Sequence, residues 1–326
     1  MKTVVIANPR AGNGRVGRLW ADYQRNIAGL YGSPQIHLTT APNEATLLAR
    51  QAIHHGAERI VVVGGDGTVN EVINGFFENG QAIGAHVLLA IHSAGTGGDF
   101  ARAIGLPADP LAAAAFNGTK ERCIDVGKAI FINHAGEQET RYFLNIASFG
   151  SSGLIAKKVN ATSKRLGAQL SFFIGTVRGL LAYKNQCVRL RIDGYQVKEM
   201  AINTVAIANG SYFGGGMMIA PHALLDDGAF DVVIVGDVGI MTFLARAPRL
   251  YRGTHLSLPC IHNFRGPVVE AVACDNVPVL LELDGEPVGQ LPARYQILPQ
   301  ALRLYAPSIA SGPYAKQHDK SNAVVN

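Results

Sequence analysis

The chain has 326 residues, of which 48% are hydrophobic and 16% charged. This composition is that of a globular protein, and the length favours two domains. No apolar stretch reaches the roughly 18 residues that a membrane-spanning helix needs, and the start, MKTVVIANPR, becomes polar too soon for a signal peptide. We therefore expect a cytoplasmic protein, and its net charge of +5 favours anionic partners such as nucleotides, phospholipid surfaces or nucleic acid.

Strands and helices alternate in the first third of the chain. Such alternation predicts a parallel sheet with helices on both faces. The short apolar runs that indicate strands lie at 2–7, 34–38, 59–63 and 85–91, and the helical patterns lie near 15–29, 43–56 and 68–79.

Three glycine-rich stretches follow these expected strands: NPRAGNGR after the first, GGDGT after the third and SAGTGGDF after the fourth. Ligands of parallel sheets bind at the carboxyl ends of the strands, where all three stretches gather. Bare glycine backbone lets N–H groups approach a phosphate, and the helix that follows adds its N-terminal partial charge. Gly64, Gly65, Gly67 and Thr68 suit that purpose, although GGDG alone also fits a tight turn. The GGDGT stretch itself has neither the spacing of a P-loop nor that of a dinucleotide-binding GxGxxG.

The pattern changes near residue 126, where strand-like runs follow one another and turn residues separate them. This pattern predicts an antiparallel sandwich or barrel, interrupted by helices near 152–184 and 239–252. We expect domains at 1–126 and 127–308, followed by a polar tail at 309–326. The expected strands of the second domain are 141–148, 188–192, 202–209, 230–235, 267–274 and 279–284.

The four cysteines are far apart in the sequence and show no CxxC spacing. This favours reduced, buried thiols over a metal or disulfide role. The residues concerned are Cys123, Cys187, Cys260 and Cys274.

The motif GGDGTVNEVINGF (64–76) resembles the signature of the diacylglycerol kinase catalytic superfamily, which includes bacterial lipid kinases and sphingosine kinases. Further segments match that family in order, so the resemblance extends from residue 2 to about 307. They are NPRAGNG (8–14), AGTGGDFAR (94–102), NIASFG (145–150), the stretch from NGSYFGGG to AFDV (209–232), and LDGE (283–286).

The resemblance implies a phosphofructokinase-like α/β domain beside a β-rich domain, with ATP in the cleft between them. Thr39 is the loosest of the implied nucleotide contacts, because Thr40 adjoins it and helix capping explains either threonine equally well. The implied ATP contacts are Asn8, Pro9, Arg10, Ala11, Gly12, Thr39, Gly64, Gly65, Asp66, Gly67, Thr68, Val69, Asn70, Glu71, Gly95 and Thr96.

The chain departs from the family at Gly98, where an asparagine is usual, and at Ser93, which often is proline. The first change removes one amide near the nucleotide and raises the possibility of weakened catalysis. Asp99, Phe100 and Arg102 are retained.

Magnesium is expected to neutralise the phosphates, because these loops offer no strongly basic clamp. The resemblance places a structural Mg²⁺ at LLDDG, held by Asp227 and by the carbonyl groups of Leu224 and Ala229. Asp226 adjoins Asp227, but the Asp-Gly pair favours Asp227. Without the resemblance, this stretch indicates a turn between strands.

Two carboxylates are candidates for the base that accepts the hydroxyl proton. The resemblance implies Glu286 of the Asp-Gly-Glu motif, with Asp284 close by. Asp66 is the alternative, and it could instead orient metal and phosphate. A hairpin turn would explain Asp-Gly-Glu equally well if the other motifs were missing.

A lipid substrate requires an approach to a membrane, and two basic, partly apolar segments, 152–184 and 240–253, suit anionic headgroups. Ordinary domain-packing helices with charged rims explain them as well. The leading hypothesis is an ATP-dependent kinase acting on a diacylglycerol-like or related lipid, peripheral to the inner membrane face. A soluble-substrate kinase resembling NAD kinase and a catalytically silent nucleotide- or lipid-binding regulator are the alternatives. No nucleic-acid recognition motif is present, and the sequence does not predict an oligomeric state.

Overall fold

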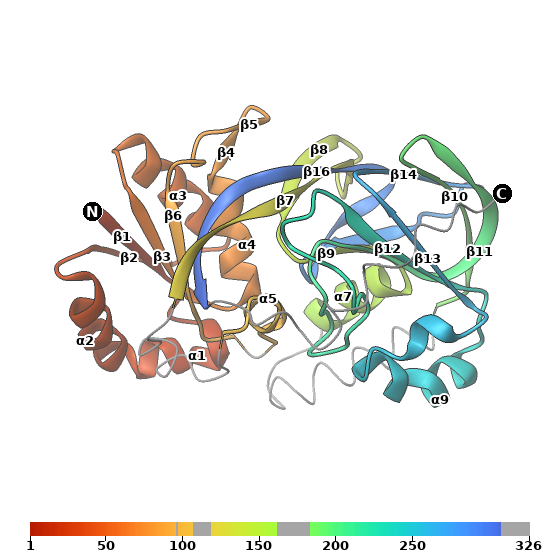
Figure 1. Cartoon of the computed structure of the whole chain (residues 1–326), viewed down its shortest axis with the longest axis horizontal. Coiled ribbons are helices and arrows are strands. Elements are labelled where there is room, and N and C mark those ends of the chain that lie inside the picture. The colour runs from red at the N-terminus through yellow and green to blue at the C-terminus, as the bar shows by residue number, and fades with distance from the viewer. Residues whose placement is uncertain (96, 107–118, 162–182, 308–326) are drawn as a thin grey trace.

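A computed structural model describes residues 1–95, 97–106, 119–161 and 183–307. One sheet of 14 strands runs through the molecule, in the order β13-β12-β11-β10-β14-β16-β6-β3-β1-β2, and β7, β8, β9 and β15 pair beside this path. Helices surround its N-terminal end at the left of Figure 1, and antiparallel strands fill the right. Within the described ranges, no helix combines the length and apolarity required to cross a membrane.

The N-terminal strands pair in parallel: β1 with β2 and β3, and β3 with β6. Their side chains alternate between two cores, so Val4 packs with α3 and α4 while Val5 packs with α1 and α2. The strands are β1 (Thr3–Ala7), β2 (Gln35–Leu38), β3 (Arg59–Gly64) and β6 (Leu88–Ser93). The helices are α1 (Ala11–Arg18), α2 (Trp20–Tyr31), α3 (Glu44–His54), α4 (Asp66–Gly75) and α5 (Asp99–Ala103).

Two expected helices differ from the observed ones. The helix expected at 15–29 is divided into α1 and α2, and α1 itself starts at Ala11 with left-handed backbone at Gly12 to Gly14. The helix expected to reach residue 79 ends at Gly75, because a small hairpin follows it. That hairpin pairs β4 (Phe77–Glu78) with β5 (Gln81–Ala82), and Asn79 and Gly80 between them both have positive φ, the usual geometry of a two-residue turn.

The remaining strands are antiparallel to one another, and three helical elements pack against them. The segment expected to be helical over 152–184 is described only up to Ala161, and residues 162–182 and the expected tail lie outside the described residues. The strands are β7 (Thr119–Asn133), β8 (Gln138–Phe143), β9 (Ile146–Gly150), β10 (Gln186–Ile192), β11 (Tyr195–Ala208), β12 (Phe230–Gly236), β13 (Ile261–Gly266), β14 (Val268–Ala273), β15 (Leu280–Leu283) and β16 (Glu286–Pro307). The helices are α7 (Ser151–Ala161), α9 (Ile240–Tyr251) and the 3₁₀ turn η2 (His255–Ser257).

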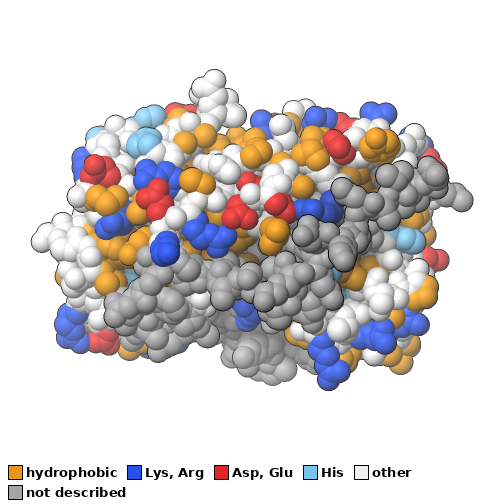
Figure 2. All heavy atoms as spheres, viewed as in Figure 1, with side chains coloured by type: hydrophobic (Ala, Val, Ile, Leu, Met, Phe, Trp, Pro, Cys, Tyr) orange, Lys and Arg blue, Asp and Glu red, His pale blue; other side chains and the backbone are white. Residues whose placement is uncertain are grey.

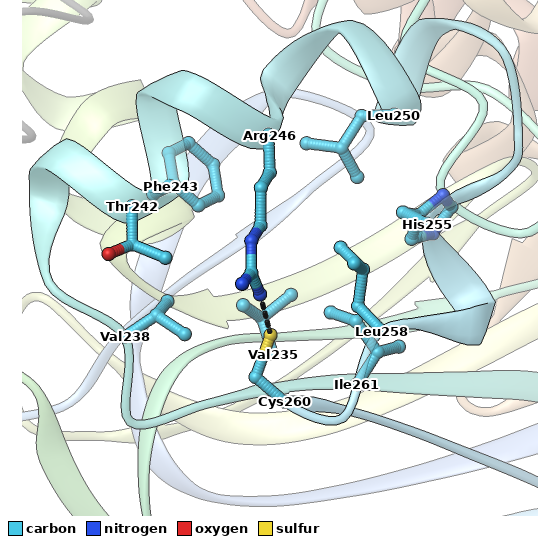
Figure 3. Close-up of a pocket in the computed structure, with 10 residues that line it drawn as sticks. All are labelled: Val235, Val238, Thr242, Phe243, Arg246, Leu250, His255, Leu258, Cys260 and Ile261. Carbon is cyan, nitrogen blue, oxygen red and sulfur yellow. Dashed lines mark hydrogen bonds between the residues drawn. The ribbon is translucent and has the colours of Figure 1, made fainter.

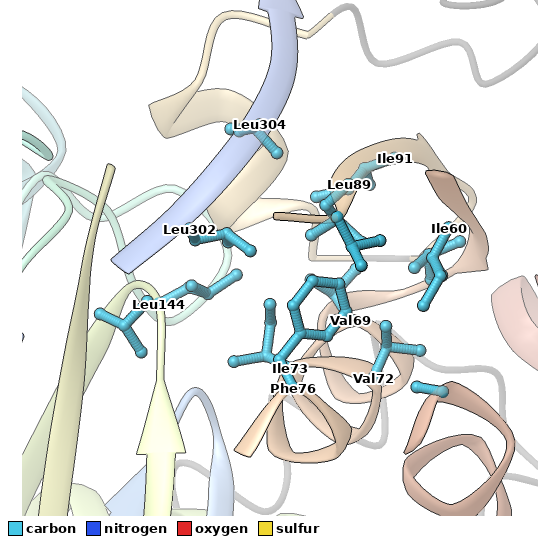
Figure 4. Packing of buried hydrophobic residues seen from close by; sticks show 14 of the residues in the cluster. Ile60, Val69, Val72, Ile73, Phe76, Leu89, Ile91, Leu144, Leu302 and Leu304 are labelled. Atoms are coloured by element: carbon cyan, nitrogen blue, oxygen red, sulfur yellow. The ribbon is translucent and has the colours of Figure 1, made fainter. Parts of the chain in front are cut away.

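Two long strands join the two ends of the molecule. β16 pairs with β7 in antiparallel fashion over most of its length, and its end pairs in parallel with β6. Leu302 and Leu304 of β16 therefore lie in the same core as Val69 of α4 and Phe76, the residue after that helix (Figure 4). The boundary expected between residues 126 and 127 falls inside β7, which crosses it without interruption.

Candidate active site

A cleft of about 700 Å³ lies where the carboxyl ends of the parallel strands face the turn between β15 and β16. Three loops of the N-terminal unit and five separate segments that follow it in the chain supply its walls. The lining residues include Asn8, Arg10, Ala11, Gly12, Gly65, Asp66, Gly67, Thr68, Val69, Glu71, Gly95, Gly97, Asp99, Phe100, Asn145, Phe213, Gly215, Tyr251, Glu282, Asp284 and Glu286.

Asn8 joins the first glycine-rich loop to the GGDGT turn. Its amide nitrogen donates to the Thr68 hydroxyl at 3.1 Å, and its side-chain oxygen accepts from the backbone N–H of Arg10 at 2.9 Å. Both loops are therefore fixed relative to each other before any ligand arrives.

The glycines of these loops are required by loop packing as well as by ligand access. A Cβ added to Gly95 would lie 2.7 Å from the Cα of Gly65, and one added to Gly12 would lie 2.4 Å from the carbonyl oxygen of Ala94. Gly12 also has a φ of +59°, which favours glycine. The backbones of the three loops are thus in direct contact. This contact is a second reason for glycine at these positions, which the sequence alone did not indicate.

Asp66 faces the start of α5 across the cleft. Its two carboxylate oxygens accept the backbone N–H groups of Asp99 at 3.3 Å and Phe100 at 3.4 Å. Burial, and then the negative charge of Asp99, raise the pKa of Asp66 to about 6. Asp99 itself accepts from Arg102 at 2.7 Å and from the N–H of Gly215 at 2.8 Å.

Gly98, the departure from the family pattern, has a φ of +61°. Asparagine and glycine are the residues that most readily adopt this left-handed backbone. The nearest atom to an added Cβ is the Ser93 hydroxyl at 3.7 Å, an ordinary contact. The replacement therefore removes an amide and keeps the backbone conformation.

Asp284 is held by four hydrogen bonds, two to each of its carboxylate oxygens. One oxygen accepts the backbone N–H groups of Asn145 and Ile146, each at 3.0 Å, and the other accepts that of Leu144 at 3.0 Å and the Asn70 amide at 2.9 Å. Burial raises its pKa, and these bonds lower it. They also explain why the single strand expected at 141–148 is divided into β8 and β9, because the N–H groups between them point at Asp284 instead of a neighbouring strand.

Glu286 is exposed and follows the same turn. A Cβ added to Gly67 would lie 3.3 Å from its Oε1, so its carboxylate lies against the GGDGT turn. Glu286 from the antiparallel part and Asp66 from the parallel part thus line one cleft, although 220 positions separate them in the chain (286 − 66).

Glu282 is a site residue that the sequence analysis missed. It is only 4% exposed, accepts the hydroxyl of Ser148, and accepts the N–H of Gly285 at 2.6 Å. Burial, with the nearby charges of Asp284 and Glu286 as lesser contributions, raises its pKa to about 8, so it is protonated at neutral pH. Its place two residues before the Asp-Gly-Glu motif, with the period-2 side-chain alternation of a strand, was the available signal.

The charge of the cleft is strongly acidic. Among its described lining residues, Arg10 is the one with a cationic side chain, whereas Asp66, Glu71, Asp99, Glu282, Asp284 and Glu286 are carboxylic acids. A nucleotide triphosphate cannot approach such a surface favourably without accompanying cations.

The other expected nucleotide contacts divide into three groups. Three of them, Pro9, Gly64 and Asn70, do not line the cleft, although Asn70 donates a hydrogen bond to the lining residue Asp284. Thr96 lies outside the described residues. Thr39 is buried and does not line the cleft. Thr40 fits the alternative of a helix-start contact, since its N–H and hydroxyl donate to Glu44 at 2.5 and 2.9 Å.

The residues expected to hold structural magnesium, Leu224, Asp227 and Ala229, lie outside the cleft lining. The Asp227 carboxylate accepts the N–H of Ala229 at 3.3 Å and forms an ion pair with Arg265. Arg265 also lies 3.4 Å from Asp231, so it is a competing cation at this place. Asp226 pairs instead with Arg122 at 3.2 Å.

The basic helix expected at 240–253 is α9, and its apolar side packs onto the sheet. A gap of about 20 Å³ remains between Phe243, Leu250 and the strands (Figure 3), which is room for one water molecule and too little for a ligand. Arg246 points inward, with its guanidinium 3.5 Å from the Cys260 sulfur. Arg249 and Arg252 are exposed, and Figure 2 shows Lys and Arg side chains gathered where α9 lies in Figure 1.

Two family descriptions match the chain. Residues 2–129 match the diacylglycerol kinase catalytic domain, and residues 145–306 match the YegS C-terminal NAD kinase beta sandwich-like domain. Together they cover both walls of the cleft.

Individual relatives match over almost the whole chain. The chain is 30% identical to the "Probable lipid kinase YegS-like" of Chromohalobacter salexigens over 83% of both chains. It is 27% identical to the "Diacylglycerol kinase" of Staphylococcus carnosus, over 97% of this chain and 98% of that protein. The crystal structure of a diacylglycerol kinase from Bacillus anthracis strain Sterne superposes with a TM-score of 0.68 and 23% identity, covering 94% of this chain and 96% of that one, which shows a shared fold.

Proposed function

Since the chain belongs to the family of diacylglycerol kinases and YegS-like lipid kinases, we propose that it transfers the γ-phosphate of ATP to a hydroxyl group of a diacylglycerol-like or related lipid. The observation that carries this proposal is the placing of Asp66 and Glu286 in one cleft, next to backbone that glycine leaves open. Phosphoryl transfer requires bound phosphates, an aligned hydroxyl and a group that takes or orients its proton, and this cleft offers candidates for each.

The glycine-rich loops are proposed to hold the phosphates. The N–H groups at the start of α4 and the helix dipole favour negative charge there, and Arg10 adds one cation at the rim. Asn8 keeps the first loop and the GGDGT turn in register during binding.

The oxygen-rich donor set of the cleft fits Mg²⁺. Burial, and then the negative charge of Asp99, raise the pKa of Asp66, and a divalent cation would offset both effects. Magnesium bound with ATP would supply neutralisation of the phosphate charge. Asp66 and Asp99 would then hold the metal–nucleotide complex against the start of α5.

Glu286 is our assignment for the general base. Its carboxylate is exposed and lies against the GGDGT turn, whereas Glu282 is buried and protonated and Asp284 holds the turn in place through its hydrogen bonds. We assign Asp284 the positioning of this turn against β8, β9 and α4. Asp66 remains the alternative base, and its pKa of about 6 leaves it ionised at neutral pH.

We also propose a structural magnesium at Leu224, Asp227 and Ala229. Carboxylate and carbonyl oxygens are the ligands that Mg²⁺ prefers. To bind there, Mg²⁺ must either displace the Arg265 guanidinium from the Asp227 carboxylate or bind this carboxylate together with it.

Approach to the lipid is proposed to involve α9. Its exposed Arg249 and Arg252 suit anionic headgroups, and the exposed side chains of Met241 and Tyr251 can enter the interface. Because Tyr251 also lines the cleft, this helix connects the expected membrane side with the site of transfer.

The test is transfer of radiolabelled γ-phosphate from ATP to a panel of micellar lipids, with and without Mg²⁺. A labelled product with one lipid class establishes the activity and names the substrate. Labelling of a soluble acceptor such as a dinucleotide, with no lipid product, would replace the lipid by a soluble substrate. ATP binding without transfer to any acceptor would indicate a regulator.

A further inference from the structure

Cys187 and Cys274, which the sequence leaves unrelated, lie directly opposite each other on neighbouring strands. β10 and β14 are antiparallel with Val188 opposite Ala273, and the N–H of Cys274 donates to the carbonyl oxygen of Cys187 at 3.0 Å. The two Sγ atoms are 2.7 Å apart. The other two cysteines, Cys123 and Cys260, are single thiols elsewhere in the fold.

The distance between the sulfur atoms distinguishes two kinds of site. Two thiolates on one tetrahedral zinc ion, each about 2.3 Å from the metal, would stand roughly 3.8 Å apart. A disulfide brings its sulfur atoms to about 2.05 Å and accepts Cα separations of about 4.4–6.8 Å, which include that of a hydrogen-bonded cross-strand pair. The observed 2.7 Å is closer to the disulfide value.

The surroundings also favour a sulfur–sulfur bond over a metal. Glu199 is the one further described group close enough to complete a metal site, and its carboxylate is already engaged by Arg189, whose Nε donates to it at 2.8 Å. Burial, and then the hydrogen bond with Cys187, raise the pKa of Cys274 to about 12. Cys274 is therefore protonated at neutral pH, which disfavours a metal because metals bind the thiolate, and Cys274 must lose this proton before it can attack a mixed disulfide.

We propose that Cys187 and Cys274 form a reversible disulfide between β10 and β14, made by exchange with a small disulfide such as oxidised glutathione. The Cys187 thiolate attacks one sulfur of that disulfide, forms a mixed disulfide and releases one small thiolate, which takes up the Cys187 proton. Cys274 then loses its proton, attacks the Cys187 sulfur and releases the second small thiol. Two protein thiols are oxidised by two electrons, and one small disulfide is reduced to two thiols.

The bond would close a loop of 87 sequence positions across the antiparallel part of the sheet. Closing a long loop restricts the unfolded chain and so stabilises the folded one. It would also fix the end of β14, and five residues (275–279) separate Cys274 from β15, which carries Glu282. The site does not depend on the proposed kinase activity.

The experiment incubates the full chain in buffers of increasing ratio of oxidised to reduced glutathione, blocks remaining thiols with N-ethylmaleimide, and measures intact mass and linked peptides. We expect two blocked thiols, a peptide linking residues 187 and 274, a melting temperature several degrees higher, and reversal by dithiothreitol. Cys187→Ser and Cys274→Ser should abolish the link, whereas Cys123→Ser and Cys260→Ser should preserve it.

Four blocked thiols under every ratio, or a link that involves Cys123 or Cys260, would overturn the proposal. So would stoichiometric binding of Zn²⁺ to the reduced chain that is lost in Cys187→Ser and competed by a chelator, because that result assigns the pair to a metal. If a serine variant fails to fold, the peptide map of the unmodified chain still decides the outcome.

Discussion

The carboxylate of Asp284 accepts a hydrogen bond of 2.9 Å from the side-chain amide of Asn70, 214 positions earlier in the chain. Asn70 belongs to α4, which starts at the GGDGT turn, and Asp284 belongs to the turn that carries Glu286. This single contact therefore links the expected phosphate-binding helix to the expected base.

Replacing Asp284 by asparagine should disturb that link. The asparagine NH₂ group would replace an oxygen that now accepts two donors, so buried N–H groups lose their acceptor. We expect a loss of about 1–3 kcal/mol in the free energy of unfolding, measured by urea denaturation, together with lower turnover. Asp275→Asn, at an exposed position outside the cleft lining, is the control and should change neither. Unchanged stability in Asp284→Asn would contradict the positioning role.

Glu286→Gln should abolish transfer and leave ATP binding intact. The amide keeps the size of the side chain but cannot accept a proton, and general bases contribute about 10²–10⁴-fold to rate. Turnover is measured by the lipid phosphorylation assay and ATP affinity by calorimetry. Glu137→Gln, on the exposed β7–β8 turn, is the matched control. Near-normal turnover in Glu286→Gln, with loss in Asp66→Asn, would move the base to Asp66.

Gly65→Ala should destabilise the cleft. Its Cβ would lie 3.0 Å from the Cα of Gly95, so the two loops must separate. We expect a loss of about 1–3 kcal/mol in folding stability, typical of overpacking, and weaker ATP binding. Gly29→Ala is the control, because α2 offers open space around that exposed position. It should raise stability by up to about 1 kcal/mol. Equal effects of both substitutions would disprove the close packing of the loops.

The buried acid Glu282 should make stability depend on pH. Its pKa is raised from 4.5 to about 8 in the folded chain, so between these values the folded state binds more protons than the unfolded one. Its contribution is thus fully present below pH 4.5 and is lost as pH rises through 8. Glu282→Gln stays neutral, so its unfolding free energy should fall less between pH 5 and 8 than that of the unmodified chain, by a few kcal/mol. Urea denaturation at several pH values measures this, and an unchanged slope would show that Glu282 is ionised in the folded state.

Magnesium without ATP should stabilise the chain through Asp227. We expect MgCl₂ to raise the melting temperature of the unmodified chain and of Asp226→Asn, but not that of Asp227→Asn. The comparison uses the change caused by magnesium, because Asp227→Asn also loses its ion pair with Arg265. If all three proteins respond equally, the structural magnesium lies elsewhere.

The sequence predicted most elements that have a strong local pattern. α3, β3 and β12 lie within two residues of their expected positions, because each combines a clear apolar period with glycine or polar residues at its ends. β7 and β16 were missed, since β7 begins with charged residues and prolines interrupt the strand pattern of β16.

The candidate site residues that short motifs supplied lie together in one cleft, and their roles stay predictions. The GGDGT turn and Glu286 were found as motifs, and both line the cleft. Glu282 was missed because its importance depends on burial and on Ser148, which is 134 positions away. The division of 141–148 into two strands likewise depends on Asp284, a distant partner that no local pattern reveals.

The parallel pairing of β16 with β6 has a consequence for how this chain reaches its native state. Leu302 and Leu304, which complete the core around α4, are synthesised after nearly all the rest of the described chain. The N-terminal unit emerges first from the ribosome but lacks these residues, so contacts of very long sequence separation must close before its core is full, and such topologies fold slowly. The core of the N-terminal unit is thus completed by the last strand that the structure describes.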